Sequence, residues 1–306
     1  MSEAQEQAKP HALLRPQIAL PFLLVALIWG STWYVITGQI HAVPPSWSIV
    51  YRFGLATPAM FVVALAMRNP LRMTSRGHAL ALLLGLTQFC GNFNFVYRAE
   101  QHLTSGVVAV MFGMLMVPNA LLARWWLGQA VTRRFLLGSA VAIAGIALLL
   151  VHEAHVARLG GNVLLGVALA LGGLMSASIA NVGQATETGR AQPMITLLAF
   201  SMLYGTLIDG ALAWVLAGPP VVPSAPAFWA GTAWLALAGS VVTFPLYWSI
   251  VRAIGPGRAA YNGVLVIVIA MFISTFVEGY EWSLLAVAGA TLGTAGMIIA
   301  LRARQI

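Results

Sequence analysis

Long uncharged, apolar stretches alternate with short clusters of charged residues along the whole chain. No Asp, Glu, Lys or Arg occurs in the stretches 77–97, 101–123, 135–152, 159–186, 191–208, 259–277 and 282–301. Two longer uncharged stretches are each divided by a pair of prolines, at Pro44-Pro45 and at Pro219-Pro220. About 20 apolar residues in a helix cross the hydrocarbon core of a bilayer. The pattern therefore predicts ten membrane-spanning helices, at about 17–37, 47–67, 78–97, 104–123, 134–151, 162–185, 193–216, 228–250, 257–277 and 282–301.

The two halves of the chain carry a similar pattern of small residues. The segment 104–150 aligns with 255–301 at a constant offset, so that Gly106, Gly128, Gly138 and Gly145 fall on Gly257, Gly279, Gly289 and Gly296. Ala109 and Ala144 likewise fall on Ala260 and Ala295. Two related halves that enclose one site are typical of secondary transporters.

The basic residues predict the orientation of the spans, because cytoplasmic loops carry an excess of Lys and Arg. Thirteen basic residues fall on one predicted face: Lys9, Arg15, Arg68, Arg72, Arg76, Arg124, Arg133, Arg134, Arg190, Arg252, Arg258, Arg302 and Arg304. The opposite face holds only Arg98 and Arg158. Both termini are therefore expected in the cytoplasm. Five spans per half, an odd number, then make the fold an all-α membrane protein with two inverted five-helix repeats.

Composition excludes several classes of function. The chain is 60% hydrophobic and 8% charged, whereas soluble domains carry about 25% charged residues. The net charge of +8 follows from the loop arginines, and no basic soluble segment indicates a nucleic-acid partner. The single cysteine, Cys90, rules out a disulfide framework, and the sequence has no phosphate-binding loop. We expect no catalytic residues, no metal and no cofactor.

Polar and aromatic residues inside the predicted spans are the candidates for the lining of a central pathway, because polar groups avoid lipid. In chain order these substrate-binding candidates are Trp29, Ser31, Trp33, Tyr34, Gln88, Asn92, Tyr97, Asn119, Ser178, Asn181, Gln184, Thr243, Tyr247, Tyr261 and Asn262. The alternative for the polar residues is a hydrogen bond across a helix interface. The alternative for the two tryptophans is an anchoring role near the membrane surface.

Two charged residues lie within the predicted spans. Arg52 and Asp209 are both about two helical turns from the predicted outer ends of their helices. We consider that they approach each other in one state, or that Arg52 alone attracts a substrate carboxylate. The alternative is that each side chain reaches the outer headgroups or water.

Helix breakers and small residues suggest which spans move and which pack. Pro58, Pro118 and Pro245 are expected to kink spans two, four and eight, which makes them hinge and gating candidates. Small residues four apart, at Gly138 and Ala142 and at Gly289 and Gly293, predict that spans five and ten pack closely as a peripheral scaffold. A monomer is expected, and a dimer through this surface is the alternative.

Several of these segments together resemble a known family. The motifs are 26–33 (Ala-Leu-Ile-Trp-Gly-Ser-Thr-Trp), 51–53 (Tyr-Arg-Phe) and 95–99 (Phe-Val-Tyr-Arg-Ala), followed by Gly106, Pro118 and Leu127-Gly128, with a second set at 252–260 and 289–296. They resemble EamA domains of the drug/metabolite transporter superfamily, and in particular ten-helix bacterial amino-acid exporters of the YddG type. The resemblance implies a cytoplasmic tail at 1–16, one EamA repeat at 17–152, a periplasmic linker at 153–161 and a second EamA repeat at 162–303.

The expected function combines the uncharged pathway with this resemblance. The resemblance implies an exporter of neutral and aromatic amino acids, or related small metabolites, in the bacterial inner membrane. It would work by alternating access, and we expect facilitated rather than coupled transport, because Asp209 is the only carboxylate within the spans. The alternative is an exporter of drugs or nucleobases with the same fold, with proton coupling as a variant.

Overall fold

The structure is a computed structural model that describes residues 16–156, 162–254, 259 and 261–301. The described residues are helical and form no strand. The elements are α1 (Pro16–Ile40), α2 (Pro45–Ala66), α3 (Ser75–Leu84), η3 (Gly85–Asn92), α4 (Phe93–Ala99), α5 (Ser105–Gly113), α6 (Met116–Leu127), α7 (Arg133–Val156), α8 (Val163–Gly183), α9 (Glu187–Ala191), α10 (Met194–Ala217), α11 (Pro226–Ala233), η4 (Trp234–Val242), α12 (Thr243–Ile254), α14 (Tyr261–Val277) and α15 (Leu284–Leu301).

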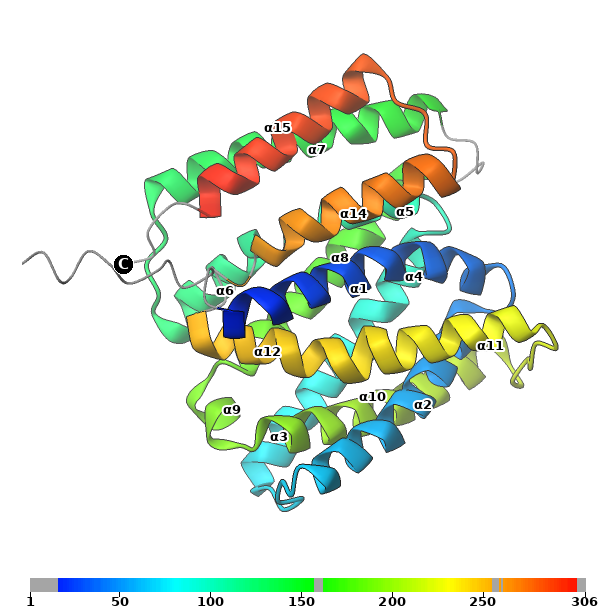
Figure 1. The fold of residues 1–306 in the computed structure, drawn as a ribbon, viewed down its shortest axis with the longest axis vertical. Coiled ribbons are helices and arrows are strands. Elements are labelled where there is room, and N and C mark those ends of the chain that lie inside the picture. Colours follow the sequence, from blue (N-terminus) through cyan, green and yellow to red (C-terminus); the bar gives the residue numbers. More distant parts are fainter. Residues whose placement is uncertain (1–15, 157–161, 255–258, 260, 302–306) are drawn as a thin grey trace, which may run out of the picture.

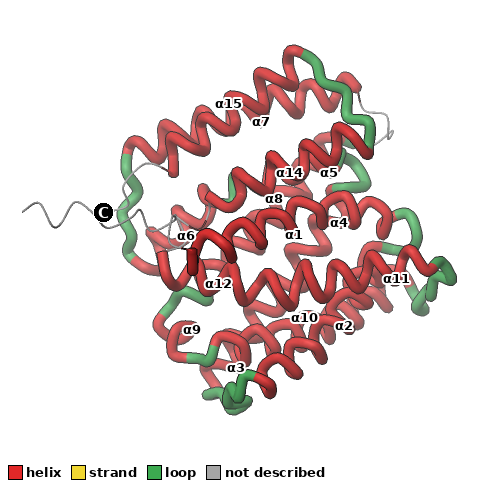
Figure 2. Tube along the Cα trace, viewed as in Figure 1, coloured by secondary structure: helices red, strands yellow, loops and turns green. Residues whose placement is uncertain are grey.

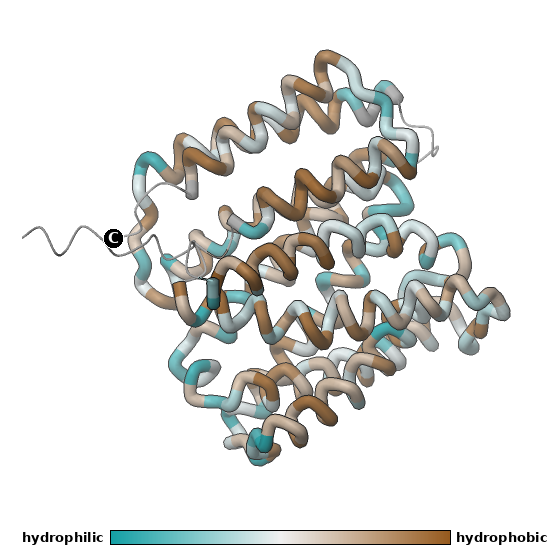
Figure 3. Tube along the Cα trace, viewed as in Figure 1, coloured by the Kyte–Doolittle hydropathy of each residue, from teal (hydrophilic) through white to brown (hydrophobic). Residues whose placement is uncertain are grey.

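Eight helices or continuous helical segments of the described chain are long and apolar enough to cross a membrane, and they coincide with the first eight predicted spans. The last two predicted spans correspond to shorter apolar helices, Asn262–Val277 and Leu284–Ala300. Hydrophobic residues are most dense along α1 and α14, and hydrophilic residues gather at the ends of the helices and in the loops (Figure 3). The protein is therefore consistent with a multi-pass membrane protein, and the count of ten spans stays a prediction.

The helices lie side by side with the loops at the two ends of the bundle (Figure 2). The α7 and α15 helices form a pair at one edge, and α2, α3 and α10 lie at the opposite edge (Figure 1). Between these edges, α1 packs against α14 and α12, and α8 packs against η3 and α4. This arrangement leaves α1, α8, η3, α12 and α14 around the centre.

The predicted close packing of spans five and ten is present as the α7–α15 pair. A Cβ atom added to Gly145 would collide with the backbone of Gly293, and one added to Gly296 would collide with the backbone of Ala142. A Cβ atom on Gly138 would meet the backbone of Ala300 in the same way. We call this contact between the two helices the glycine seam. Glycine is required here because the two backbones approach too closely for any side chain.

Two π-helical segments interrupt the α-helices. The first, η3, lies within the third predicted span, and the second, η4, lies within the eighth. A π turn adds one residue to a helical turn and is often found at functional sites. The packing of the two segments is also similar, because η3 packs on α10 and η4 packs on α2.

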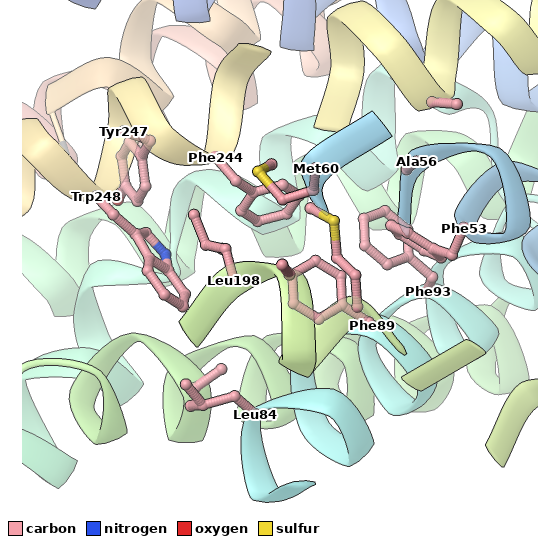
Figure 4. Packing of buried hydrophobic residues seen from close by; sticks show 14 of the residues in the cluster. Phe53, Ala56, Met60, Leu84, Phe89, Phe93, Leu198, Phe244, Tyr247 and Trp248 are labelled. Carbon is pink, nitrogen blue, oxygen red and sulfur yellow. The ribbon is translucent and has the colours of Figure 1, made fainter. Parts of the chain in front are cut away.

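Aromatic residues join four helices below the centre of the bundle. Phe53 of α2 lies 5.2 Å from Phe89 and 4.9 Å from Phe93, between ring centroids. Phe89 in turn lies 5.2 Å from Phe244 of α12. Figure 4 shows these rings with Trp248, Leu198 and Leu84 around them. Two members of this cluster, Phe93 and Phe244, line the site described below.

The three prolines have different local effects. The helix of span four is interrupted between α5 and α6, at residues 114–115, and Pro118 lies in the first turn of α6, where it cannot donate a hydrogen bond to the carbonyl of Met114. Pro245 lies at the start of α12, just after η4. Pro58, in contrast, lies inside the continuous helix α2, and the expected kink of span two stays a prediction.

Some predicted boundaries differ from the structure or lie outside it. The α7 helix continues to Val156, so the predicted linker at 153–161 begins inside a helix. The uncharged stretch ends before Glu153, but a single charged residue does not end a helix. Residues 157–161 of the linker, and all but the last residue of the predicted tail at 1–16, lie outside the described residues.

Candidate functional site

A cavity of about 140 Å³ lies at the centre of the bundle. Seven elements or pairs of elements contribute to its wall, from both halves of the chain: α1, α2, η3 with α4, α5 with α6, α8, α12 and α14. Eight of the predicted residues line it: Trp29, Trp33, Arg52, Gln88, Asn92, Asn181, Tyr247 and Asn262. The sequence therefore indicated much of the polar and aromatic wall.

Other predicted residues lie away from this cavity. Ser31 donates to the carbonyl of Ile28 and accepts from the indole of Trp234, and Tyr34 is 41% exposed. Ser178 donates to the Asn119 side chain at 2.7 Å, which is the interhelical hydrogen bond considered as the alternative. Tyr97, Gln184 and Thr243 are fully buried without lining the cavity. The side chain of Tyr261 lies outside the described residues.

Arg52 is the charged residue of the cavity wall. Its side chain is 2% exposed and extends from α2 towards η4. Its Nε and Nη2 atoms each donate to Ser240 Oγ at 3.2 Å, and Nη2 also donates to the carbonyl of Gly239 at 3.3 Å. The guanidinium carbon lies 4.3 Å from the centre of the Phe93 ring, in a cation–π contact. The remaining nitrogen, Nη1, is buried without a hydrogen-bond partner.

Aromatic side chains form much of the rest of the wall. The Trp29 indole nitrogen donates to the carbonyl of Gly239 at 3.3 Å, and the ring centroids of Trp29 and Tyr247 are 4.9 Å apart. Phe244 lies 5.7 Å from Trp29 in an edge-on arrangement. On another side, the Trp33 and Phe112 rings are 5.2 Å apart. These rings offer apolar faces to a planar or hydrophobic ligand.

Carboxamides supply the uncharged polar groups of the cavity. Asn262 donates through Nδ2 to the backbone carbonyl of Phe22, which leaves its Oδ1 atom buried without a partner. Asn92 Oδ1 is also buried without a partner. Buried polar groups usually have a partner, so these two oxygens are unsatisfied acceptors of residues that line the cavity.

Asp209 belongs to a different part of the molecule. Its carboxylate is fully buried and accepts from Asn94 Nδ2 at 2.6 Å. Arg98 donates to Asn94 Oδ1 at 2.6 Å and to Ser46 Oγ at 2.9 Å. The contact considered between Asp209 and Arg52 is absent in this structure, because Arg52 faces η4 while Asp209 faces α4. Equal depth along two helices does not decide which sides of those helices face each other.

A second buried acid lies between α4 and α5. Glu100 is 2% exposed, although it belongs to a predicted loop. Burial and the nearby Glu278 carboxylate raise the pKa of Glu100 well above its usual range, which favours the neutral acid. Glu278 itself accepts from Ser105 at 2.6 Å. This pair is outside the cavity.

The structure adds residues that the sequence analysis did not select. Phe93, Phe112 and Phe244 line the cavity. Phe244 and Tyr247 are three residues apart on α12, so helical spacing could have identified Phe244. The analysis favoured polar residues, however, and η4 changes the helical register between Ser240 and Tyr247. Ser240 therefore binds Arg52, while Thr243 points away from the cavity.

Comparison with known proteins finds a family resemblance in part of the chain. Residues 17–151 match the EamA-like transporter family. The matched region lies in the first half of the chain, and the division into two repeats stays a prediction.

Similar proteins extend over nearly the whole chain. Protein PagO of Salmonella typhimurium is 21% identical over 87% of this chain and 86% of its own length. The uncharacterized inner membrane transporter YedA of Escherichia coli is 26% identical, with 85% and 84% covered, and the uncharacterized transporter YyaM of Bacillus subtilis is 24% identical, with 92% and 93% covered. A crystal structure with 19% identity has a TM-score of 0.65 over 94% of this chain and 96% of its own, which supports a shared fold. These findings support a multi-pass membrane transporter with an EamA domain.

Proposed function

We propose that the protein is a secondary transporter that exports neutral and aromatic amino acids, or related small metabolites, across the bacterial inner membrane. The observation that carries this proposal is the central cavity, which both halves of the chain enclose and in which aromatic faces surround Arg52. In this proposal a substrate carboxylate accepts from the Arg52 guanidinium, whose Nη1 atom is buried without a hydrogen-bond partner, and the rings fit an apolar or aromatic side chain.

Alternating access between two inverted five-helix repeats is the proposed mechanism. The positions of η3 and η4 support it, since each lies in the third span of its half and packs on the second span of the other half. The proposal counts α14 and α15 as the last two of ten spans. The packing of the short α15 helix along α7, which is long enough to cross the membrane, supports this count. A shared site between two such repeats can open to either side in turn.

Uncoupled, facilitated transport is the form that the structure supports best. Asp209 is hydrogen-bonded to Asn94 and does not line the cavity, so the substrate does not meet a membrane carboxylate. The monomer is the proposed unit, because the glycine seam joins two helices of one chain. An exporter of drugs or nucleobases would use the same aromatic faces but would leave Arg52 without an anionic partner.

Transport by purified protein in liposomes tests the proposal. We expect labelled phenylalanine or tryptophan to exchange across the membrane, and Trp29→Ala to raise the half-saturation concentration about tenfold through loss of an aromatic contact. Trp125→Ala is the matched control, because Trp125 is 76% exposed at the end of α6 and should leave exchange unchanged. Absence of exchange for a full panel of amino acids and related acids would contradict the proposed function.

The proposed orientation has its own test. In intact cells, a cysteine introduced by Ser224→Cys, in the exposed segment between α10 and α11, should react with an impermeant maleimide from outside. A cysteine introduced by Ser2→Cys should react only after the cells are opened. The native Cys90 is buried and gives the background. Labelling of both positions from the same side would mean that the topology is wrong.

A further inference from the structure

The cavity carries an electrical charge that the protein does not neutralise. We infer that the cavity selects a net anion, an aromatic monocarboxylate without an ammonium group, in preference to the corresponding zwitterionic amino acid. This inference rests on the proposed function and specifies the substrate class of the same site.

The first step is the surroundings of Arg52. Its hydrogen-bond acceptors, Ser240 Oγ and the Gly239 carbonyl, are both neutral. The Tyr97 hydroxyl is a further neutral neighbour. No Asp or Glu lines the cavity among the described residues. Asp209, the carboxylate within the same set of helices, is bonded to Asn94 instead.

The second step is the cost of a buried charge. A guanidinium that is removed from water is stable only when an anion or several hydrogen bonds compensate for the lost hydration. Arg52 has partial compensation from Ser240, Gly239 and the Phe93 ring, but Nη1 has no acceptor. A carboxylate beside Nη1 would complete the hydrogen bonds and bring the net charge of the cavity to zero.

The third step concerns the ammonium group of an amino acid. The polar groups left to receive it are the carboxamides of Gln88, Asn92, Asn181 and Asn262. Their oxygens accept hydrogen bonds but carry no negative charge. A zwitterion would therefore leave the cavity with a net charge of +1 and would place a second desolvated cation near Arg52. The corresponding acid without the amino group avoids both costs.

The fourth step is the body of the ligand. Phe93 lies directly against the Arg52 guanidinium, and Trp29, Phe244 and Tyr247 surround the adjacent space. When the carboxylate of a ligand binds Arg52, the rest of that ligand therefore lies beside these aromatic rings. An aryl group attached by a short chain to a carboxylate matches this combination of charge and surface.

Three ligands of nearly equal shape separate these contributions: 3-phenylpropanoate, L-phenylalanine and phenethylamine. Their dissociation constants can be measured at pH 7.5 on the purified full chain, from the change in tryptophan fluorescence. We expect 3-phenylpropanoate to bind roughly tenfold more tightly than L-phenylalanine, because of the uncompensated ammonium group. Phenethylamine should bind more weakly than either.

Two variants test whether the charge of the cavity causes the preference for 3-phenylpropanoate over L-phenylalanine. In Arg52→Met the advantage of 3-phenylpropanoate over L-phenylalanine should disappear. In Asn92→Asp, which places a carboxylate in the cavity wall with little change of shape, the preference should shift roughly tenfold towards L-phenylalanine. The second variant keeps Arg52 and its contacts, so it remains informative if Arg52→Met does not fold.

The possible outcomes distinguish this inference from the proposed function. If L-phenylalanine binds as tightly as 3-phenylpropanoate and is exchanged in liposomes, the inference is wrong and the proposed function stands. If the preference for the anion persists in Arg52→Met, or does not change in Asn92→Asp, the inference is also wrong. If none of the three ligands binds and no amino acid or related acid is exchanged, both are wrong.

Discussion

Replacing Gly296 with alanine is expected to lower the thermal stability of the purified protein strongly, whereas the same change at Gly293 is expected to have little effect. The two residues lie one helical turn apart on α15. A Cβ atom at Gly296 would collide with the backbone of Ala142 and would lie 2.8 Å from the Gly138 carbonyl oxygen. At Gly293 the nearest atoms would be 3.9 Å and 4.0 Å away, which is ordinary contact.

The loss of stability in Gly296→Ala depends on which atoms must move to make room for the added Cβ atom. Backbone atoms cannot rotate away as a side chain can, so α7 and α15 would have to separate along the glycine seam. Overpacking of a well-packed interior costs about 1–3 kcal/mol, and a backbone collision belongs at the upper end of that range. Alanine is also the better helix former by about 1 kcal/mol, which makes Gly293→Ala neutral or slightly stabilising.

The measurement is a melting curve of each variant in the same detergent, followed by loss of the monodisperse peak in size-exclusion chromatography. Gly145→Ala, on the opposite side of the seam, should behave like Gly296→Ala because its Cβ atom would meet the backbone of Gly293. If alanine at positions 293 and 296 had equal effects, the seam would have a different register from the one described.

The close packing of α7 and α15 could be predicted because small residues at a spacing of four can serve only a few purposes in lipid. The positions of the spans could also be predicted. A chain in lipid must form helices to satisfy its backbone hydrogen bonds, so each long uncharged stretch indicates one helix. Both properties depend on residues near one another in the sequence. Trp29, Asn92 and Asn262 could be selected for the cavity because a deep polar or amphipathic group needs a non-lipid neighbour.

The partners of individual side chains could not be predicted from the same information. Arg52 and Asp209 lie at similar depth, but depth does not give the rotation of a helix about its axis. The π segment η4 changes that rotation within one span, so that Ser240 and Tyr247 do not follow the spacing of an α-helix. Asn94, which connects Asp209 with Arg98, was not among the selected residues, although it lies four residues before Arg98 on the same face of α4.

Replacing Asn94 with leucine is expected to destabilise the protein by about 1–3 kcal/mol, which is the usual cost of leaving a buried polar group without its hydrogen-bond partner. Leucine has nearly the shape of asparagine but cannot donate to Asp209 or accept from Arg98. Asp209 is fully buried, so water does not replace the lost hydrogen bond. The free energy of unfolding, measured by titration with a denaturing detergent, is the relevant quantity.

The double variant Asn94→Leu with Asp209→Leu shows whether the cost arises at Asp209. Removal of both partners from a buried polar pair can be nearly neutral, whereas removal of one leaves the other unsatisfied. We therefore expect the double variant to be more stable than Asn94→Leu alone, even though it carries one more substitution. A double variant that is less stable than the single one would contradict this account, because Asp209 would then depend on some other group.

The same pair of variants bears on transport, because the Asp209 network connects α10 with α4 and α2 while the cavity lies on the other side of α4. If the network only holds these helices together, variants that recover stability should also recover exchange in liposomes. Loss of exchange in a double variant of normal stability would instead place Asp209 in the transport cycle, and uncoupled transport would have to be abandoned. The Asn94 variants thus show whether Asp209, the only carboxylate within the predicted spans, has a structural role or a role in ion coupling.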